Sequence, residues 1–185
     1  MAAVRVALLR GINVGRAKRI AMADLKSLIE TLGYRDVRTL LNSGNVVFTV
    51  PTAVRGDAAA RIEEGLATRL KVPARVTVLD GEELAAMVAK NPFGALARDP
   101  SRLLVAVPRR PADRARLAPL ARRDWAPEAF RLGARAGFVW CPKGQLESPL
   151  FEALAKAMGE DVTTRNWATM TKLQALAEAI PSKNG

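Results

Sequence analysis

Residues 7–15 read Ala-Leu-Leu-Arg-Gly-Ile-Asn-Val-Gly, and this stretch sets the organisation of the chain. The apolar run from Val4 to Leu9 predicts a buried strand that stops at Arg10 and turns through two glycines. A basic cluster follows at Arg16, Lys18 and Arg19. Because glycines let backbone N–H groups approach a ligand closely, this order can form an anion-binding concavity. The alternative is a strand-ending loop whose cations only keep it solvated.

Length and composition indicate a globular protein. The chain has 185 residues, 49% hydrophobic and 25% charged, which suits one large domain or two small ones. No apolar run approaches the ~20 residues of a membrane helix, and Arg5 and Arg10 interrupt the first apolar run. A single cysteine, Cys141, excludes an internal disulfide. We therefore expect a soluble, cytoplasmic protein that is monomeric or weakly dimeric.

Several kinds of chemistry are excluded by residues that the chain lacks. It contains no histidine, which removes the Ser-His-Asp triad, the Cys-His pair and His-ligated zinc. Cys141 closes an apolar strand and is expected to be a packed thiol. The glycines Gly11 and Gly15 lack the Gly-Lys-Ser/Thr ending of a phosphate loop. We expect neither a metal nor a cofactor.

Positive charge is the strongest compositional signal. The formal net charge is +11, which is typical of proteins with polyanionic partners such as nucleic acid. Residues 5–19 hold five cations and no anion, and residues 98–123 hold eight arginines against Asp99 and Asp113. An arginine-leaning base composition of the genome would also raise the charge, so the local patches are more informative than the total.

The first half alternates strand and helix patterns. With the opening strand, the order is β-α-β-β-α-β, which can form a four-stranded antiparallel sheet with both helices on one face, the ferredoxin-like arrangement. A hairpin is predicted at Asn42-Ser43-Gly44-Asn45. The expected helices cover 23–33 and 58–70, and the further strands cover 37–41, 46–50 and 76–79.

The second half repeats much of this pattern after a boundary at Asp80–Gly81, which divides the chain into domains 1–80 and 81–185. We expect an α+β protein of two ferredoxin-like halves with mainly antiparallel sheets and a C-terminal helix. That helix is predicted to begin near Thr164. The other expected elements are helices over 82–89, 112–122 and 151–158, and strands over 103–107, 129–132 and 137–141.

Three stretches together carry a family resemblance: Leu8–Gly15, Ser43–Phe48 and Thr164–Leu173. In order and spacing the whole chain resembles the bacterial family called domain of unknown function 1697, including Met22 and Leu25. The resemblance implies a small cytoplasmic α+β protein of two ferredoxin-like parts and no settled activity. The family's loop after the second hairpin tends to read Gly-x-Gly-Arg-Ser-Lys-Leu. Here residues 144–150 read Gly-Gln-Leu-Glu-Ser-Pro-Leu, so an anion-binding role of that loop is not carried over.

Eight residues at strand ends and the predicted helix start are candidates for binding an anion or nucleic acid. We expect Arg10, Asn45 and Arg165 to line one concave site, with Arg165 in the first turn of the last helix, where it binds a ligand or pairs with Asp161. The candidates are Arg10, Asn13, Arg16, Lys18, Ser43, Asn45, Arg165 and Asn166.

These candidates favour a binding module for a phosphate-bearing partner, most simply nucleic acid. Two alternatives stay open. One is an enzyme acting on a small anionic or phosphorylated metabolite, with the same residues as orienting and charge-stabilising groups. The other is a protein-interaction module. No catalytic residue and no metal ligand is assigned.

Overall fold

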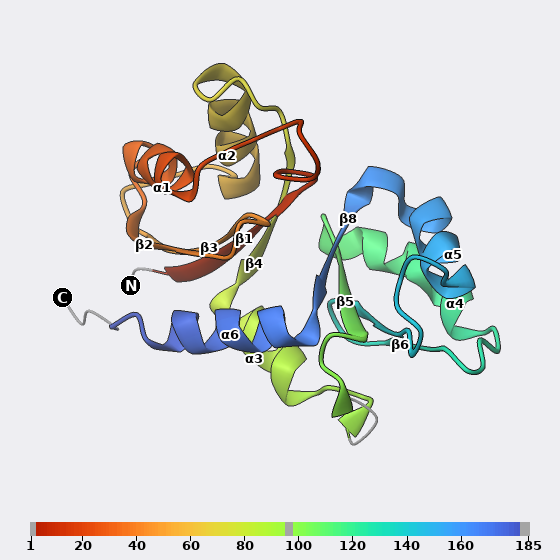
Figure 1. Cartoon of the computed structure of the whole chain (residues 1–185). Coiled ribbons are helices and arrows are strands. Elements are labelled where there is room, and N and C mark those ends of the chain that lie inside the picture. Colours follow the sequence, from red (N-terminus) through yellow and green to blue (C-terminus); the bar gives the residue numbers. More distant parts are fainter. Residues whose placement is uncertain (1–2, 95–97, 182–185) are drawn as a thin grey trace. The chain divides into compact units, whose positions relative to one another are not determined.

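The computed structural model describes residues 3–94 and 98–181 (Figure 1). The chain divides into two compact units. One is formed up to Leu84 together with Leu173 onward, and the other runs from Ala85 to Lys172. The predicted domains 1–80 and 81–185 assign the whole C-terminal helix to the second half. In the structure that helix is shared, because its residues from Leu173 pack within the first unit.

The first unit has the predicted strand and helix order. Its sheet is ordered β2-β3-β1-β4 with antiparallel neighbours, which is the ferredoxin-like topology. Helices α1 and α2 lie together on one face of this sheet (Figure 1). The elements are β1 (Ala3–Arg10), α1 (Met22–Thr31), β2 (Arg35–Leu40), β3 (Asn45–Val50), α2 (Ala58–Thr68) and β4 (Arg75–Asp80).

Strand β1 is apolar on both sides because both faces of its sheet are covered. Ala7 and Leu9 pack in the core formed with α1 and α2. Val6 and Leu8 point to the opposite face and are equally inaccessible to solvent. The C-terminal end of the chain lies against β2 of this unit, where the Arg38 guanidinium donates to the Ala179 carbonyl at 3.4 Å. A strand buried on both faces therefore reads as a continuous apolar run.

The second unit repeats the topology. Its sheet is ordered β6-β7-β5-β8, again with antiparallel neighbours. The elements after β4 are α3 (Gly81–Ala89), β5 (Leu103–Pro108), the 3-10 helix η2 (Pro111–Leu117), α4 (Ala118–Ala121), β6 (Ala129–Leu132), β7 (Gly137–Trp140), α5 (Pro149–Met158), the 3-10 helix η3 (Gly159–Asp161), β8 (Val162–Asn166) and α6 (Trp167–Glu178).

Two predictions for the second half need correction. The helix expected over 112–122 is a 3-10 helix followed by the short helix α4, with Pro119 near the start of α4. The last helix was expected to begin near Thr164, but Val162–Asn166 form strand β8, paired with β5. The β-branched residues at 162–164 favour a strand, and this local preference outweighs the helical spacing that continues beyond Trp167.

Helix starts follow capping rules. Asp57 accepts from the Ala59 N–H at 2.9 Å at the start of α2, and Ser148 accepts from the Phe151 N–H at 2.9 Å at the start of α5. At the start of α3 the Glu83 carboxylate accepts from the Asp80 N–H at 2.9 Å, which is the return half of a capping box. Polar side chains that accept hydrogen bonds from the backbone thus fix the residues at which these helices begin.

Candidate functional site

The loop between β1 and α1 is held in shape by one side chain. The Asn13 N–H donates to the Lys18 carbonyl at 3.0 Å, which closes a narrow turn over residues 13–18. The Asn13 side-chain oxygen accepts from the Ile20 N–H at 2.8 Å, and its amide nitrogen donates to the Ile20 carbonyl at 2.9 Å. The same amide donates to the Asn42 carbonyl at 2.7 Å, which ties the loop to the β2–β3 turn. This loop is therefore a fixed projection of the first unit.

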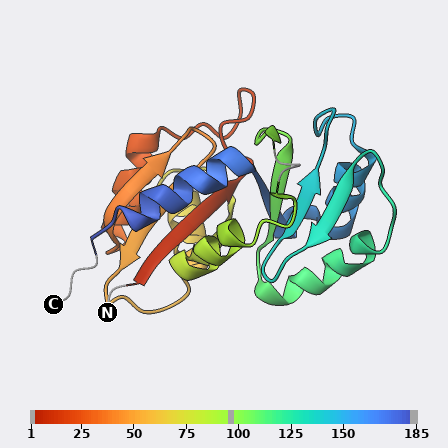
Figure 2. The ribbon, with the colours of Figure 1, turned by 90° about the horizontal axis from the view of Figure 1, so that it is seen from below.

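The backbone of this loop uses left-handed conformations. Gly11 and Gly15 have φ of +70° and +62°, and Asn13 and Lys18 have φ of 54° and 51°. Asparagine tolerates this region because its short polar side chain bonds locally. Figure 2 shows the loop, in red-orange, extending beyond the end of β1.

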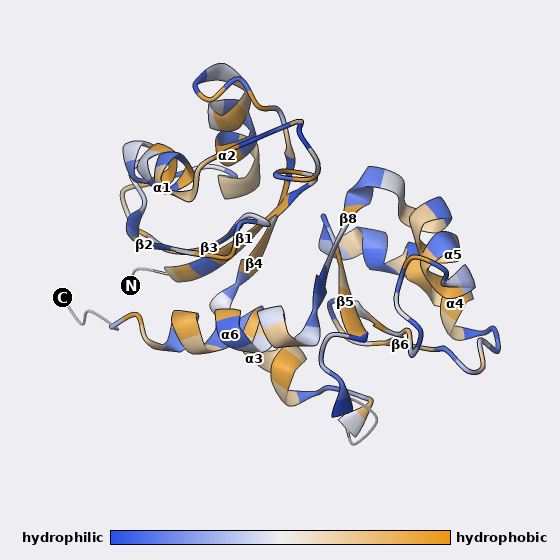
Figure 3. Cartoon of the chain, viewed as in Figure 1, coloured by the Kyte–Doolittle hydropathy of each residue, from blue (hydrophilic) through white to orange (hydrophobic). Residues whose placement is uncertain are grey.

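The cations of this loop point to solvent. Arg16, Lys18 and Arg19 are exposed, and none makes an ion pair or side-chain hydrogen bond with another described residue. Figure 3 shows the segment that leads from the loop tip to α1 in the blue of hydrophilic residues. These three side chains are not used to stabilise the fold, and residues 11–19, which carry them, are here called the basic loop.

Two further arginines lie where β1 ends and β4 begins. Arg10 stands directly opposite Arg75 in the antiparallel ladder, whereas at the other end of the same ladder Arg5 faces Asp80 and forms an ion pair with it. Like charges directly opposite destabilise a sheet, and opposite charges stabilise it. The Arg75 guanidinium lies 3.9 Å from Glu63. Sequence reasoning overlooked Arg75, although the ferredoxin-like order already places the start of the fourth strand beside the end of the first.

Ser43 and Asn45 have their polar groups engaged in the β2–β3 turn. Asn45 is fully buried, and its amide donates to the Leu40 carbonyl at 2.8 Å and to the Ser43 hydroxyl at 2.9 Å. The Gly44 carbonyl accepts from the Leu9 N–H at 2.8 Å, which joins the turn to β1. These bonds stabilise the turn beside the basic loop. A contact of either side chain with a ligand stays a prediction.

Arg165 and Asn166 belong to the second unit, and the predicted helical setting of Arg165 is wrong. Arg165 lies in strand β8, and its guanidinium donates to the Thr164 carbonyl at 3.0 Å. Asn166 caps α6, since its side-chain oxygen accepts from the Thr169 N–H at 2.9 Å and from the Thr169 hydroxyl at 2.8 Å. A hollow shared by Arg165, Arg10 and Asn45 stays a prediction.

The arginines of segment 98–123 are largely engaged in ion pairs and hydrogen bonds within the second unit. Arg116 pairs with Asp161 at 2.8 Å, so the predicted partner of Arg165 is bound by another arginine. Arg110 pairs with Asp113 at 2.9 Å, and its hydrogen bond lowers the pKa of that carboxyl below the usual value. The Arg114 guanidinium donates to the Gly133 carbonyl at 2.6 Å. These arginines satisfy carbonyl and carboxylate oxygens, which is a structural role.

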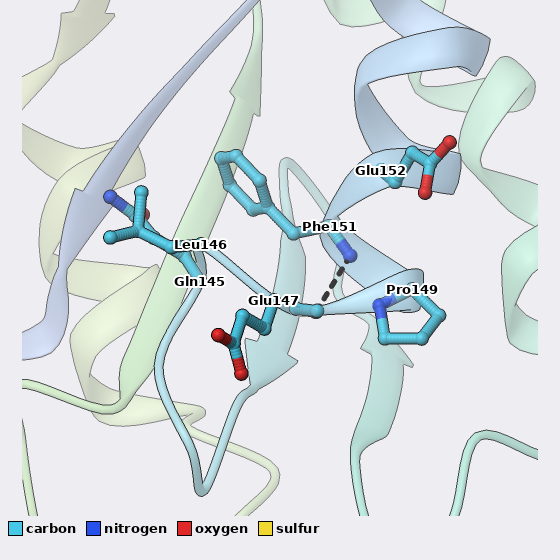
Figure 4. A pocket seen from close by; sticks show the side chains of 7 residues that line it. Gln145, Leu146, Glu147, Pro149, Phe151 and Glu152 are labelled. Atoms are coloured by element: carbon cyan, nitrogen blue, oxygen red, sulfur yellow. Dashed lines mark hydrogen bonds between the residues drawn. The ribbon is translucent and has the colours of Figure 1, made fainter.

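A pocket of about 510 Å³ lies in the second unit before α5 (Figure 4). Two carboxylates, Glu147 and Glu152, contribute its charge, and the neighbouring Leu146 is 96% exposed. The Cys141 thiol lies 3.4 Å from the hydroxyl of Ser148, which lines the pocket, and burial raises the pKa of this thiol. A buried thiol with a raised pKa is a poor nucleophile. The pocket is lined by Gln145, Leu146, Glu147, Ser148, Pro149, Phe151 and Glu152.

Comparison with known proteins places the chain in a family. The sequence profile of "Protein of unknown function (DUF1697)" matches residues 2–138. The chain belongs to this family. A solved structure, "The structure of conserved bacterial protein SP0830 from Streptococcus pneumoniae", is similar over 96% of this chain and 99% of that chain, with 22% sequence identity and a TM-score of 0.72. That likeness supports the two-part α+β fold. No curated protein matches the chain.

In this DUF1697 protein the residues that line the pocket include the carboxylates of Glu147 and Glu152 and no basic side chain. The pocket is therefore acidic, and an anion would be repelled there. Among the described residues no group of three or more Cys, Asp or Glu is placed to hold a metal ion. No helix in the described ranges has the length and apolar character needed to cross a membrane.

Proposed function

We propose that this DUF1697 protein is a cytoplasmic binding module for nucleic acid, and that the basic loop contacts the phosphate backbone. The observation that carries the proposal is the exposure of Arg16, Lys18 and Arg19, without any neutralising partner among the described residues, on a loop whose base is held by Asn13. Arginine and lysine on one exposed loop form the electrostatic footprint of a phosphate-binding surface.

The contrast between the two units supports this choice. In the second unit the arginines of segment 98–123 mostly serve carboxylates and carbonyls of the fold. In the first unit Arg16, Lys18 and Arg19 serve no such partner among the described residues. These exposed charges repel one another, and a polyanion would relieve this repulsion.

A polymer is favoured over a small anionic metabolite. A small-molecule site needs polar groups that converge on one hollow. The amides best placed to converge, those of Asn13 and Asn45, donate to backbone carbonyls of the loop and the turn. The charges on the basic loop point outward to solvent, as a contact with an extended phosphate backbone requires.

Fluorescence anisotropy with labelled DNA and RNA tests the proposal. We expect binding at ~50 mM salt with a dissociation constant on the order of 10⁻⁶ M, weaker at higher salt. The triple variant Arg16→Gln, Lys18→Gln, Arg19→Gln should bind at least about tenfold more weakly. The matched control replaces Arg35, Arg55 and Lys90, which are also exposed, and should keep most of the affinity.

Two outcomes would overturn the proposal. Absence of binding to any nucleic acid at ~50 mM salt would favour the enzyme on a small anionic metabolite. Equal loss of affinity in the loop variant and the control would mean that overall charge, and not the basic loop, holds the polymer.

A further inference from the structure

The aromatic side chains of this protein offer little exposed ring surface on which bases could stack. The five Phe, three Trp and one Tyr all lie in the described ranges, and each is buried or half-buried. Both sheet faces are covered too. Val6 and Leu8 are fully buried on the face of the first sheet opposite α1 and α2, and Phe138 of the second sheet packs beside Trp167 at a ring-centroid distance of 6.4 Å. Recognition of single strands relies on such stacking.

The shape of the loop suits a duplex groove instead. The Asn13–Lys18 hydrogen bond closes a single turn, without strand pairing, whose tip lies at Gly15 and Arg16. Arg16 is flanked by the two smallest residue types, Gly15 and Ala17, so the tip is slender. The major groove of B-form DNA is about 12 Å wide and admits a two-stranded ribbon, so it has room for this turn. The major groove of A-form RNA is too narrow to admit it.

We infer that the nucleic acid bound by this protein is double-stranded DNA, and that the tip of the basic loop enters the major groove. This inference rests on the proposed function and names its ligand. Arg16 at the tip reaches the edges of bases, where guanine offers two acceptors to an arginine. Lys18 and Arg19, on the limb that returns to α1, face the phosphates that border the groove.

The apolar residue of the loop supports the same placement. Val14 is 71% exposed, although an isolated loop gains nothing from an apolar side chain in water. In a major groove the thymine methyl group offers an apolar contact next to the acceptors of guanine.

Matched probes test the inference. A DNA duplex, an RNA duplex of the same sequence and the single DNA strand are compared by anisotropy at one salt concentration. We expect the DNA duplex to bind at least about tenfold more tightly than the RNA duplex. In dimethyl sulfate footprinting, guanine N7 in the major groove should be protected, whereas adenine N3 in the minor groove should stay reactive.

The variant Arg16→Gln should lose the N7 protection, and the control Arg55→Gln should keep it, with circular dichroism confirming that both are folded. Equal binding of DNA and RNA duplexes, or protection of adenine N3 alone, would overturn the inference and leave the proposed function standing. No binding to any of the three probes would overturn the proposed function itself.

Discussion

Asn13 shows how much of a loop one side chain can determine. Its amide contacts both polar backbone groups of Ile20 and the carbonyl of Asn42, and its own backbone has φ of 54°. Sequence reasoning named Asn13 as a candidate ligand-binding residue. Its hydrogen bonds make it the residue that shapes the basic loop, and a direct contact of Asn13 with a ligand stays a prediction.

We expect Asn13→Ala to lower the free energy of unfolding by about 2–3 kcal/mol, because three hydrogen bonds are lost and alanine is strained at positive φ. The variant Asn13→Gly is the matched control, since it loses the same bonds without the strain and should cost less. Urea unfolding measures both. Equal stability of the alanine variant and the wild type would contradict the role given to this side chain.

Tyr34 has a hydroxyl that lacks a hydrogen-bond partner among the described residues. Its ring packs against Phe48 with centroids 4.7 Å apart, and the Arg61 guanidinium lies 5.5 Å from its centroid. Burial raises the pKa of Tyr34, with the charge of Arg61 acting in the opposite direction. The apolar part of this side chain therefore serves the core, whereas the hydroxyl adds a cost of desolvation.

We expect Tyr34→Phe to raise stability at neutral pH by about 1 kcal/mol, because a buried hydroxyl without a partner is removed. Because folding raises this pKa, the titration of Tyr34 makes a pH-dependent contribution to the stability of the fold. This contribution is fully present below the unfolded pKa of about 10 and is lost as the pH rises through the folded pKa. The wild type should therefore lose stability above about pH 10 more steeply than the phenylalanine variant. Unfolding curves at neutral and alkaline pH measure this. A destabilised variant at neutral pH would mean that the hydroxyl is satisfied.

At the level of elements, the β2–β3 turn and the basic loop are packed together. Gly44 has φ of +83°, and a Cβ built there would lie 2.7 Å from Ile12 Cδ1 and 2.8 Å from Leu9 Cβ. Gly15, at the loop tip, has φ of +62° and open space around the same position. Both glycines serve a left-handed backbone, but only Gly44 also permits close packing.

This difference predicts unequal effects of one substitution. Gly15→Ala should cost about 1–2 kcal/mol from backbone strain alone. Gly44→Ala should cost about 3 kcal/mol or more, because a steric clash with Ile12 and Leu9 is added to the strain. Thermal unfolding of the pair compares them under one set of conditions. Similar melting temperatures for the two variants would show that the turn relaxes away from the loop.

The elements that the sequence predicted best are those with one dominant signal. The spacing of Leu25, Leu28 and Ile29 identifies α1, and the apolar run before Arg10 identifies β1. Strand β8 was missed because the helical spacing that begins at Trp167 was extended back to Thr164, over the last three residues of the strand. A strand of this length is recognised mainly by its partner, here β5, and partners are set by the tertiary fold.

The candidate site was predicted only in part for a similar reason. Exposure of Arg16 and Lys18 follows from their place in a glycine-bearing loop, which sequence reveals. Whether an amide such as Asn45 faces solvent or a carbonyl depends on the neighbouring strand, which sequence does not specify. The ion pairs of the arginines in segment 98–123 were also not predicted, because a partner such as Asp161, which pairs with Arg116, lies far along the chain.

At the scale of the whole molecule, two units with the same strand topology are linked through α3 and α6. The net charge of +11 does not by itself distinguish a general attraction to polyanions from a specific surface. The distribution of partners supports the proposal of a specific surface, since the arginines of one unit are largely paired and the basic loop of the other is not. The number of phosphates contacted is the quantity that separates these cases.

The salt dependence of DNA binding tests the central claim most directly. The slope of log K against log salt is about −0.9 for each phosphate neutralised on duplex DNA. We predict that replacing Arg16, Lys18 and Arg19 by Gln makes the slope shallower by about 2–3, and that the control at Arg35, Arg55 and Lys90 changes it by less than about 1. A slope left unchanged by the loop variant would contradict the assignment of the basic loop as the phosphate-binding surface.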